Sequence, residues 1–298
     1  MTLALFVRRV DSHREAENLE SPGEVLSQLT AQYLAPLRGQ TVALSTSEAD
    51  DPATRHLSPL PQRELVAELA RDLFAMEARI AYGGDLREAG FTRLLVEVQR
   101  AHASSMSTAL PGIISYLLEP LSAEERADYT DAVDFVDVRF IDFDREGDDS
   151  AAAKALVQAM SLRAMRWEIA RDVAALVAVG GRTSDYTGWR PGIAEEIAAA
   201  VKAGKPIYLV GGFGGAASWY ASAAFPEGDL PNAPVTPGLG AETTGELAFP
   251  DVEEVVRALR GGRSPNGLTK AENAHLARTV NANEIVTLVL SGLAKVSE

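Results

Sequence analysis

The sequence predicts an α/β protein in which helices cover both faces of a parallel β-sheet. Short apolar runs of strand length alternate with longer segments of helical periodicity along the middle of the chain. Two of the runs, "ALVAV" and "PIYLV", are apolar throughout, as strands buried on both faces tend to be. Glycine-rich turns follow several of the runs, which is common where a strand leads into a crossover helix.

The middle of the chain divides into predicted strands and helices. Compact apolar runs predict strands at 40–47, 78–84, 133–143, 175–181 and 206–212. Apolar residues at helical spacing predict helices at 61–77, 90–104, 151–173 and 191–203. Because strands joined by helical crossovers pair in parallel, we predict a Rossmann-like three-layer domain over residues 40–225.

Segments of a different character flank this domain. Residues 1–39 have the pattern of a short strand and a helix, and are interpreted as an N-terminal extension. Residues 226–250 are rich in proline and glycine without any period, which is typical of lid loops and linkers. Three short helical segments follow, and Thr269 with Glu272 fits a capping box at the start of the second. We therefore predict that residues 226–298 form a lid loop and a helical cap, or half of a dimer interface.

Composition and charge argue against several classes of protein. The net charge of −14 repels phosphate backbones and disfavours nucleic-acid binding. The chain has no cysteine, no apolar run of the roughly 18 residues that a membrane span needs, and no signal-peptide order at its start, so we expect a cytoplasmic protein. We expect no metal and no cofactor, because phosphate-loop and nucleophile-elbow motifs are absent and the histidines have no ligand spacing: His13, His56, His102 and His275.

The predicted strands end in residues that suit a ligand site. The glycine pairs and the polar end of the first strand are Gly83-Gly84, Gly180-Gly181, Gly211-Gly212 (continuing as Phe213-Gly214-Gly215) and Ser45-Thr46-Ser47. In an open parallel sheet, ligands bind outside the carboxyl ends of strands, and glycine lets the backbone approach phosphate oxygens closely. Asp85 is placed to accept a hydrogen bond from a ribose hydroxyl or to cap its turn, and Thr92 lies near the start of the next helix.

Nine residues, "RTSDYTGWR", separate the second glycine pair from the helix that begins near Pro191. We predict that aromatic side chains of this insertion stack on a base and that its arginines pair with phosphate: Tyr186 or Trp189, and Arg182 or Arg190. The alternative is that the two aromatic rings only close a hydrophobic lid. The other predicted ligand-binding residues lie at the two ends of the insertion: Thr183, Pro191 and Gly192.

The segment "GG…PGIAEE" resembles the PGG-x-GT-x-E-E signature of LOG-type cytokinin-activating phosphoribohydrolases. The preceding "LRAMRWEIARDVAALVAVGG" is similar to the arginine-bearing helix and strand before that signature. Together with "SEADDPATRHLSPL", "AYGGDLREAGFT", "KPIYLVGGFGGAAS" and "NGLTKAENAHLA", these segments resemble a stand-alone, sensor-type domain of the SLOG superfamily, which also includes the DNA-processing protein A fold. The resemblance covers residues 40–225 and leaves 1–39 unassigned.

The resemblance implies that a nucleotide or a nucleotide derivative binds over the glycine turns. In the hydrolases, the arginine and glutamate of the signature act on the N-glycosidic bond of a nucleoside monophosphate. Glu195 or Glu196 matches that glutamate, and Arg166 matches the arginine, with Arg163 as the other candidate. Both glutamates are also favoured in a first helical turn by the helix dipole alone, and Arg166 alternatively pairs with surface acids. The nine-residue insertion departs from the compact signature.

The function that these patterns favour is a sensor of a nucleotide-derived signal, ADP-ribose-like or a cyclic or linear dinucleotide, in a bacterial signalling or defence system. The alternative is a phosphoribohydrolase. A sensor needs a route of output, so a homodimer and an effector protein are expected partners. A role in binding single-stranded DNA fits poorly with the negative charge.

Overall fold

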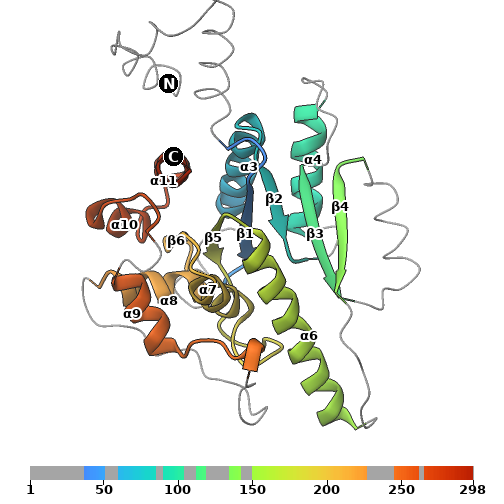
Figure 1. The fold of residues 1–298 in the computed structure, drawn as a ribbon. Coiled ribbons are helices and arrows are strands. Elements are labelled where there is room, and N and C mark those ends of the chain that lie inside the picture. The colour runs from blue at the N-terminus through green and yellow to red at the C-terminus, as the bar shows by residue number, and fades with distance from the viewer. Residues whose placement is uncertain are drawn as a thin grey trace, which may run out of the picture.

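The computed structural model describes residues 37–50, 60–84, 90–103, 112–118, 134–141, 150–226, 245–261 and 265–297 (Figure 1). Its strands are β1 (Thr41–Ser47), β2 (Arg79–Tyr82), β3 (Ile113–Leu118), β4 (Val136–Ile141), β5 (Ala175–Gly180) and β6 (Ile207–Val210). Its α-helices are α3 (Leu60–Ala75), α4 (Phe91–Ala103), α6 (Ala151–Asp172), α7 (Gly192–Lys202), α8 (Gly215–Ala224), α9 (Val252–Arg260), α10 (Lys270–Leu276) and α11 (Ala282–Val296). A short 3₁₀ helix, η3 (Gly245–Leu247), precedes α9.

The six strands form one sheet in the order β4-β3-β2-β1-β5-β6, and every neighbouring pair is parallel. The chain runs outward from β1 to β4, then returns and continues through β5 to β6 on the other side of β1. The direction of winding therefore reverses between β1 and β5, where Ser47 pairs with Gly180. The predicted α/β fold with a parallel sheet is confirmed, and the reversal marks where such sheets open a crevice for ligands.

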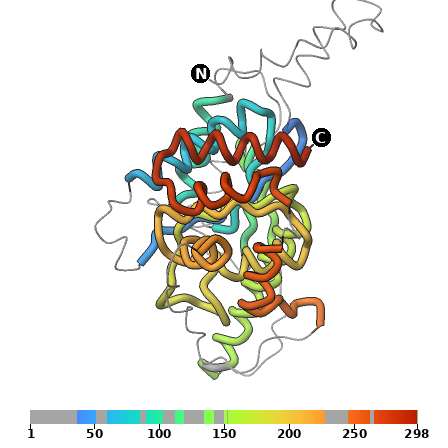
Figure 2. The backbone as a smooth tube through the Cα atoms, turned by 90° about the vertical axis from the view of Figure 1, so that its left-hand side faces the viewer, coloured from blue at the N-terminus to red at the C-terminus, as the bar shows by residue number. Residues whose placement is uncertain are grey.

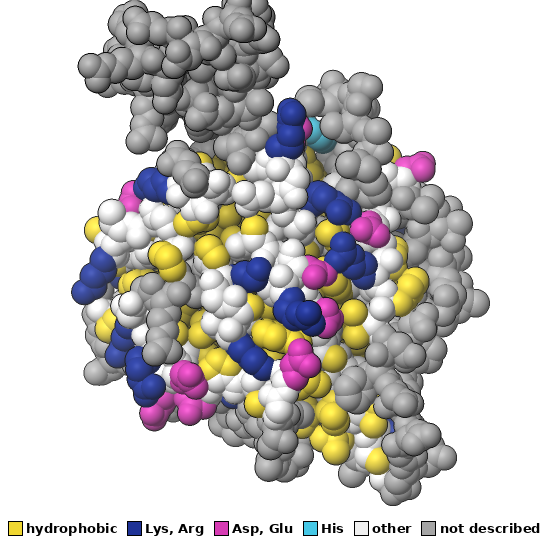
Figure 3. All heavy atoms as spheres, viewed as in Figure 1, with side chains coloured by type: hydrophobic (Ala, Val, Ile, Leu, Met, Phe, Trp, Pro, Cys, Tyr) yellow, Lys and Arg dark blue, Asp and Glu magenta, His cyan; other side chains and the backbone are white. Residues whose placement is uncertain are grey.

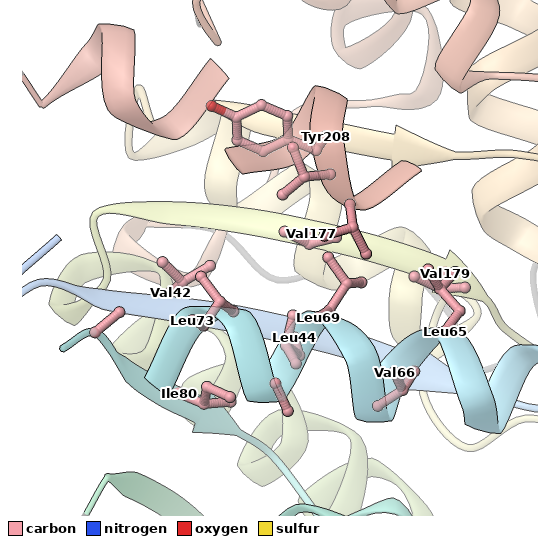
Figure 4. Close-up of a cluster of buried hydrophobic side chains, with 14 of the residues drawn as sticks. Val42, Leu44, Leu65, Val66, Leu69, Leu73, Ile80, Val177, Val179 and Tyr208 are labelled. Atoms are coloured by element: carbon pink, nitrogen blue, oxygen red, sulfur yellow. The ribbon is translucent and has the colours of Figure 1, made fainter. Parts of the chain in front are cut away.

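Two hydrophobic cores lie on the two faces of the sheet because successive strand residues point to opposite sides. On β1, Val42 and Leu44 face the core shared with α3, α4 and α11, whereas Ala43 faces the core shared with α6, α7, α8 and α9. Figure 4 shows the first core, in which side chains of α3 interlock with those of the central strands: Leu65, Val66, Leu69 and Leu73 against Val42, Leu44, Ile80, Val177 and Val179. The three predicted layers are confirmed.

The C-terminal helices are divided between the two helical layers. Helix α11 packs beside α3, whereas α9 packs on α7 and α8 across the sheet. Figure 2 looks at the sheet from its β6 edge, with α10 and α11 on one side and α8 and α9 on the other. The segments predicted as a cap therefore extend both layers beyond the edge of the sheet. The capping box at α10 is confirmed, because Glu272 N–H donates to Thr269 Oγ1 at 3.2 Å and Thr269 N–H donates to Glu272 Oε2 at 2.7 Å.

The structure adds two elements that the sequence did not predict. Strand β3 comes from "IISYLL" and α8 from "GAASWYASAA". A six-residue apolar run has no period that separates strand from helix, and the alanine-rich α8 is buried almost all round, so it has no polar face to reveal it. Strand β4 is shorter than the predicted 133–143.

The elements predicted within residues 1–36, the lid loop at 227–244, and Asp85 lie outside the described residues. Within the described ranges, no helix is long and apolar enough to cross a membrane.

The glycine pair after β6 is required by packing against the turn between α10 and α11. A Cβ built on Gly212 would lie 2.8 Å from the carbonyl carbon of Thr279 and closer still to its oxygen. A Cβ on Gly211 would overlap the carbonyl oxygen of Ala277 in the same way. These two glycines therefore let the C-terminal segment approach the end of β6, which explains their presence without a ligand.

We predict that Gly212→Val destabilises the protein by about 3 kcal/mol or more, because backbone atoms cannot yield as a flexible side chain can. Gly204→Ala is the comparison, since its Cβ would meet nothing within 4 Å and it carries only the penalty of a φ of +67°, about 1–2 kcal/mol. Urea unfolding of both variants measures the difference. A Gly212→Val protein as stable as the wild type would contradict the packing described here.

Candidate functional site

The carboxyl ends of β1 and β5 are tied together at the point where the winding of the sheet reverses. Gly181 N–H donates to the Ser47 carbonyl at 2.8 Å. Gln62 of α3 donates from Nε2 to the same carbonyl at 3.0 Å and to Thr46 Oγ1 at 2.9 Å. Gly180 has a φ of +68°, and a Cβ there would lie 2.6 Å from the Ser47 oxygen, so this approach requires glycine.

Ser45 contributes a buried hydroxyl to this crevice. The residue is 2% exposed, and its Oγ makes no hydrogen bond of normal geometry with the described part of the chain, but it acts on the Glu196 carboxyl in the first turns of α7. Desolvation raises the pKa of Glu196 above its usual value, although Arg166 and the Ser45 hydroxyl act in the opposite direction. A buried hydroxyl with such an incomplete bond is uncommon in native proteins, and a bound ligand is one way to complete its hydrogen bonding.

Helix α7 begins at this crevice with N–H groups that no side chain caps. Helices α6, α9, α10 and α11 each have a side-chain N-cap, whereas α7 begins after Pro191 and α8 after Gly214, which provide none. At α8, the Gly181 carbonyl accepts from Ala216 N–H at 3.2 Å. At α7, the first intrahelical bond is that of Glu195 N–H to the Pro191 carbonyl, so the preceding N–H groups have no partner within the helix. The free positive end of a helix attracts an anion.

A buried cluster of three charges lies directly behind the first turn of α7. The Glu195 carboxylate is fully buried and pairs with two arginines of α6. Arg163 donates from Nη2 at 2.6 Å and from Nε at 3.2 Å to one oxygen, and Arg166 donates from Nη1 to the other. The Arg166 guanidinium also reaches Gly192, where a Cβ would lie 3.0 Å from Nη2, while Arg166 Nε is buried without a partner in the described ranges. Two guanidinium groups thus face the Glu195 carboxylate, and Arg166 also acts on the Glu196 carboxyl in the same part of α7.

The aromatic residues of the insertion have different environments. Trp189 is 1% exposed, and the Arg163 guanidinium lies over its ring at 4.5 Å from the centroid, with Phe249 at 4.9 Å from the same guanidinium. This position gives Trp189 a structural role under the buried charges. Tyr186 retains some exposed surface, and its burial, followed by the charge of Glu195, raises the pKa of the phenol. Tyr186 is therefore the aromatic side chain of the two that a ligand can reach in this conformation.

The insertion is attached to the rest of the domain at both of its ends. The Asp50 carboxylate accepts the N–H and hydroxyl of Thr183 at 2.7 and 2.9 Å and those of Ser184 at 3.0 and 2.6 Å. Partial burial raises the pKa of Asp50, but these hydrogen bonds outweigh it and hold the pKa below its usual value. At the other end, Arg190 donates to the Pro250 carbonyl at 2.5 Å. The loop is thus held in place before any ligand binds.

The predicted site residues do not all gather in one place. Those gathered at the crevice between β1 and β5 and the start of α7 are Ser45, Thr46, Ser47, Gly180, Gly181, Arg166, Pro191, Gly192 and Glu196. Others serve packing: Gly211, Gly212, Phe213, Trp189 and Arg190. Gly83 and Gly84 follow β2, where Ser115 Oγ donates to the Gly84 carbonyl at 3.3 Å, and Thr92 is fully buried on α4. Sequence reasoning missed Asp50 and Gln62, whose partners are far away in the chain.

The groups at this crevice are of the kind that hold anions in proteins. Arg166 Nε is buried without a partner in the described part of the chain, Ser45 Oγ faces Glu196, and the uncapped first turn of α7 begins beside the Arg166 guanidinium. No group of three His, Asp or Glu side chains among the described residues is placed to hold a metal ion. A phosphate group at the start of α7 would accept from Arg166 and from the free N–H groups of the helix.

Comparison with known protein families gives the affiliation of the chain. The family model described as SLOG cluster2 matches residues 36–227, which is well over half of the sequence, and the chain therefore belongs to this family. The match ends near the C-terminus of α8, so it contains the whole sheet and the crevice. A search of curated proteins found no match.

We predict that Glu195→Gln lowers the free energy of unfolding by about 3–5 kcal/mol, because it leaves two buried guanidinium groups without a counter-charge. Glu168→Gln is a matched control on α6, since Glu168 pairs with Arg171 at the surface and such exposed pairs contribute at most about 1 kcal/mol. Equal losses in the two variants would show that the buried cluster is not a stabilising unit.

Glu196→Gln is expected to have the opposite effect, with a defined dependence on pH. A carboxyl whose folded-state pKa is raised destabilises the folded state progressively as pH rises above its unfolded value, near 4.5. A glutamine side chain at this position does not ionise and carries no such penalty. The melting temperature of the variant should therefore exceed that of the wild type at pH 7–8, and the gap should close towards pH 4. A gap that is constant or widens on acidification would refute the desolvation of Glu196.

Proposed function

We propose that this member of the SLOG family binds a nucleotide-derived ligand, ADP-ribose-like or a cyclic or linear dinucleotide, over the carboxyl ends of β1 and β5. In this proposal the protein is a sensor in a bacterial signalling or defence system. The observation that supports it is the position of α7, whose uncapped first turn begins beside the Arg166 guanidinium at the reversal point of the sheet, with Arg166 Nε buried and unpaired within the described ranges.

A ligand with two phosphates fits this arrangement better than one with a single phosphate. The glycine turns after β2 and β5 flank the end of β1, and neighbouring strands are about 4.8 Å apart. Positions at the ends of the adjacent strands β1 and β5 would thus be separated by roughly the span of a diphosphate, whereas positions on either side of β1 would be about twice as far apart, nearer to the two phosphates of a cyclic dinucleotide. Tyr186 supplies a partly exposed ring for a base above the same edge.

The buried state of Glu195 supports sensing over hydrolysis. A carboxylate that stabilises developing charge on a ribose must approach the sugar, yet Glu195 is fully buried and occupied on both oxygens. A hydrolase would have to use Glu196 instead, which lies beside Ser45 and Arg166. Phosphoribohydrolase activity is therefore a second candidate that depends on Glu196 alone.

A sensor must pass its signal on to a second molecule. We propose a homodimer or an effector protein as that partner, and light scattering of the purified chain with and without nucleotide measures the first of these.

We predict that diphosphate ligands raise the melting temperature more than AMP or ribose 5-phosphate in a thermal-shift panel. A ligand at about 100 times its Kd adds about 2.7 kcal/mol to the stability of the fold. Ser45→Ala should weaken binding of the best ligand about tenfold while leaving the fold intact, because the hydroxyl that it removes makes no hydrogen bond of normal geometry with the described residues of the free protein. Ser161→Ala is the matched control, since that buried hydroxyl donates to Val157 within α6.

Two outcomes would contradict the proposal. If AMP and ribose 5-phosphate stabilise the protein more than every diphosphate tested, the site takes a single phosphate. If incubation with AMP gives steady release of adenine that Glu196→Gln abolishes, the protein is a hydrolase.

A further inference from the structure

The first half of α6 extends past the carboxyl edge of the sheet. The helix has 22 residues and is therefore about 33 Å long. Arg163, near its middle, pairs with Glu195 in the first turn of α7, which begins at the crevice. Residues 151–162 of α6 precede that pairing and span about 18 Å. In Figure 1 this part of the helix runs beyond the ends of the strands, where another molecule can reach it.

Two different faces run along α6, and one of them packs on the domain. The helix packs on the sheet and on α7. The side chains buried on that inner face are Arg163, Met165, Arg166, Ile169 and Ala170. With about 3.6 residues per turn, a second row of side chains lies on the opposite face. This outer row consists of Ala153, Val157, Met160 and Ala164, with Leu156 beside it.

The outer row has the pattern of a contact between two helices. Its members are four, three and four residues apart, which keeps them in one line along the helix and is the spacing of a coiled-coil seam. All four are part-exposed, and Leu156 beside them is 40% exposed. Figure 3 shows hydrophobic side chains along the lower right of the molecule, over α6. The row is therefore apolar surface that a second helix could cover.

The charge of this surface favours a second copy of the chain as its occupant. Each molecule has a net charge of −14, so two copies repel each other over most of their surface. Residues 151–162 contain no acid, and Lys154 is their one charged residue. Association of two copies is least opposed at a face of this kind.

The outer row also matches itself under two-fold symmetry. Its small residues lie at the two ends and its large ones in the middle. If a second α6 runs antiparallel about a point between residues 158 and 159, Ala153 lies opposite Ala164 and Val157 lies opposite Met160. A two-fold interface requires such reciprocal pairs. Because the overlapping halves extend past the sheets, the two domains lie at opposite ends of the helix pair and do not collide.

We propose that the outer row of α6 packs antiparallel against the same row of a second copy of this chain. This interface deepens the homodimer of the proposed function and rests on that part of it. It does not depend on nucleotide binding, because Arg163 and Arg166 lie on the inner face of the helix. Since the contact is apolar and the two copies have like charge, added salt should strengthen the dimer by screening their repulsion.

Cysteine cross-linking of the full-length protein tests the arrangement, because the chain has no cysteine of its own. The double variant Ala153→Cys and Ala164→Cys should form a covalent dimer on mild oxidation, since each cysteine lies opposite the other one of the partner copy. Either single variant should stay monomeric on a non-reducing gel. In the antiparallel arrangement each of these positions lies about 16 Å along the helix axis from its own copy, which is too far for a disulfide.

Sedimentation velocity at several protein and salt concentrations tests the surface. Val157→Glu should raise the Kd of the dimer about tenfold or more, because it introduces a charge into the apolar contact of both copies. Phe140→Glu is the matched control, since it makes the same change of charge at an exposed apolar residue of β4. Melting temperatures establish that both variants are folded.

The outcomes separate this interface from the rest of the proposed function. A wild-type protein that is monomeric at every concentration measured would overturn both the interface and the homodimer. Covalent dimers from a single-cysteine variant, or equal weakening by Val157→Glu and Phe140→Glu, would overturn this interface and leave a homodimer through another surface. The thermal-shift panel with nucleotides is unaffected by either result.

Discussion

The fully buried pairing of Glu195 with Arg163 and Arg166 is the interaction on which the site depends. It joins α6 to the first turn of α7, which begins at the crevice between β1 and β5. Burying three charges is expensive, and the geometry offsets this with three hydrogen bonds to one carboxylate and with the ring of Trp189 against Arg163. The insertion is positioned through the same cluster, because the Trp189 ring packs against Arg163 and the Arg166 guanidinium lies close against Gly192.

This cluster also explains how a protein of negative net charge could bind an anionic ligand. Net charge describes the long-range field, which salt screens within about 8–10 Å at physiological ionic strength. A phosphate in the crevice would instead respond to groups in contact with it: Arg166, the Ser45 hydroxyl and the free N–H groups of α7. Those donors are fixed by packing, so little ordering would be needed on binding. The acidic exterior would repel long polyanions, whereas donors in the crevice would act only on a small anion that reaches them.

How much of the structure the sequence predicts depends on whether the contacts that determine each feature are between residues close together in the chain. Apolar runs, the Thr269 capping box and the glycine pairs are local signals, and they predicted the parallel sheet, the start of α10 and the edge that holds the crevice. The role of Gly212 depends on Thr279, and the attachment of Thr183 depends on Asp50, 133 positions away. Trp189 is a residue type that often stacks on bases, but in this structure its ring is covered by Arg163 of α6. Pairings of this kind have no periodicity, so a single sequence does not reveal them.

Helix α8 connects the crevice to the outer edge of the sheet. At its N-terminus, Ala216 N–H donates to the Gly181 carbonyl, and near its C-terminus Arg260 of α9 donates to the Ala223 carbonyl. The helix has ten residues and so spans about 15 Å. Its inner face is alanine and glycine packed against β5 and β6, which allows little independent movement of either end. The glycine turn after β5 and the contact with α9 are therefore held at a fixed separation by one rigid helix.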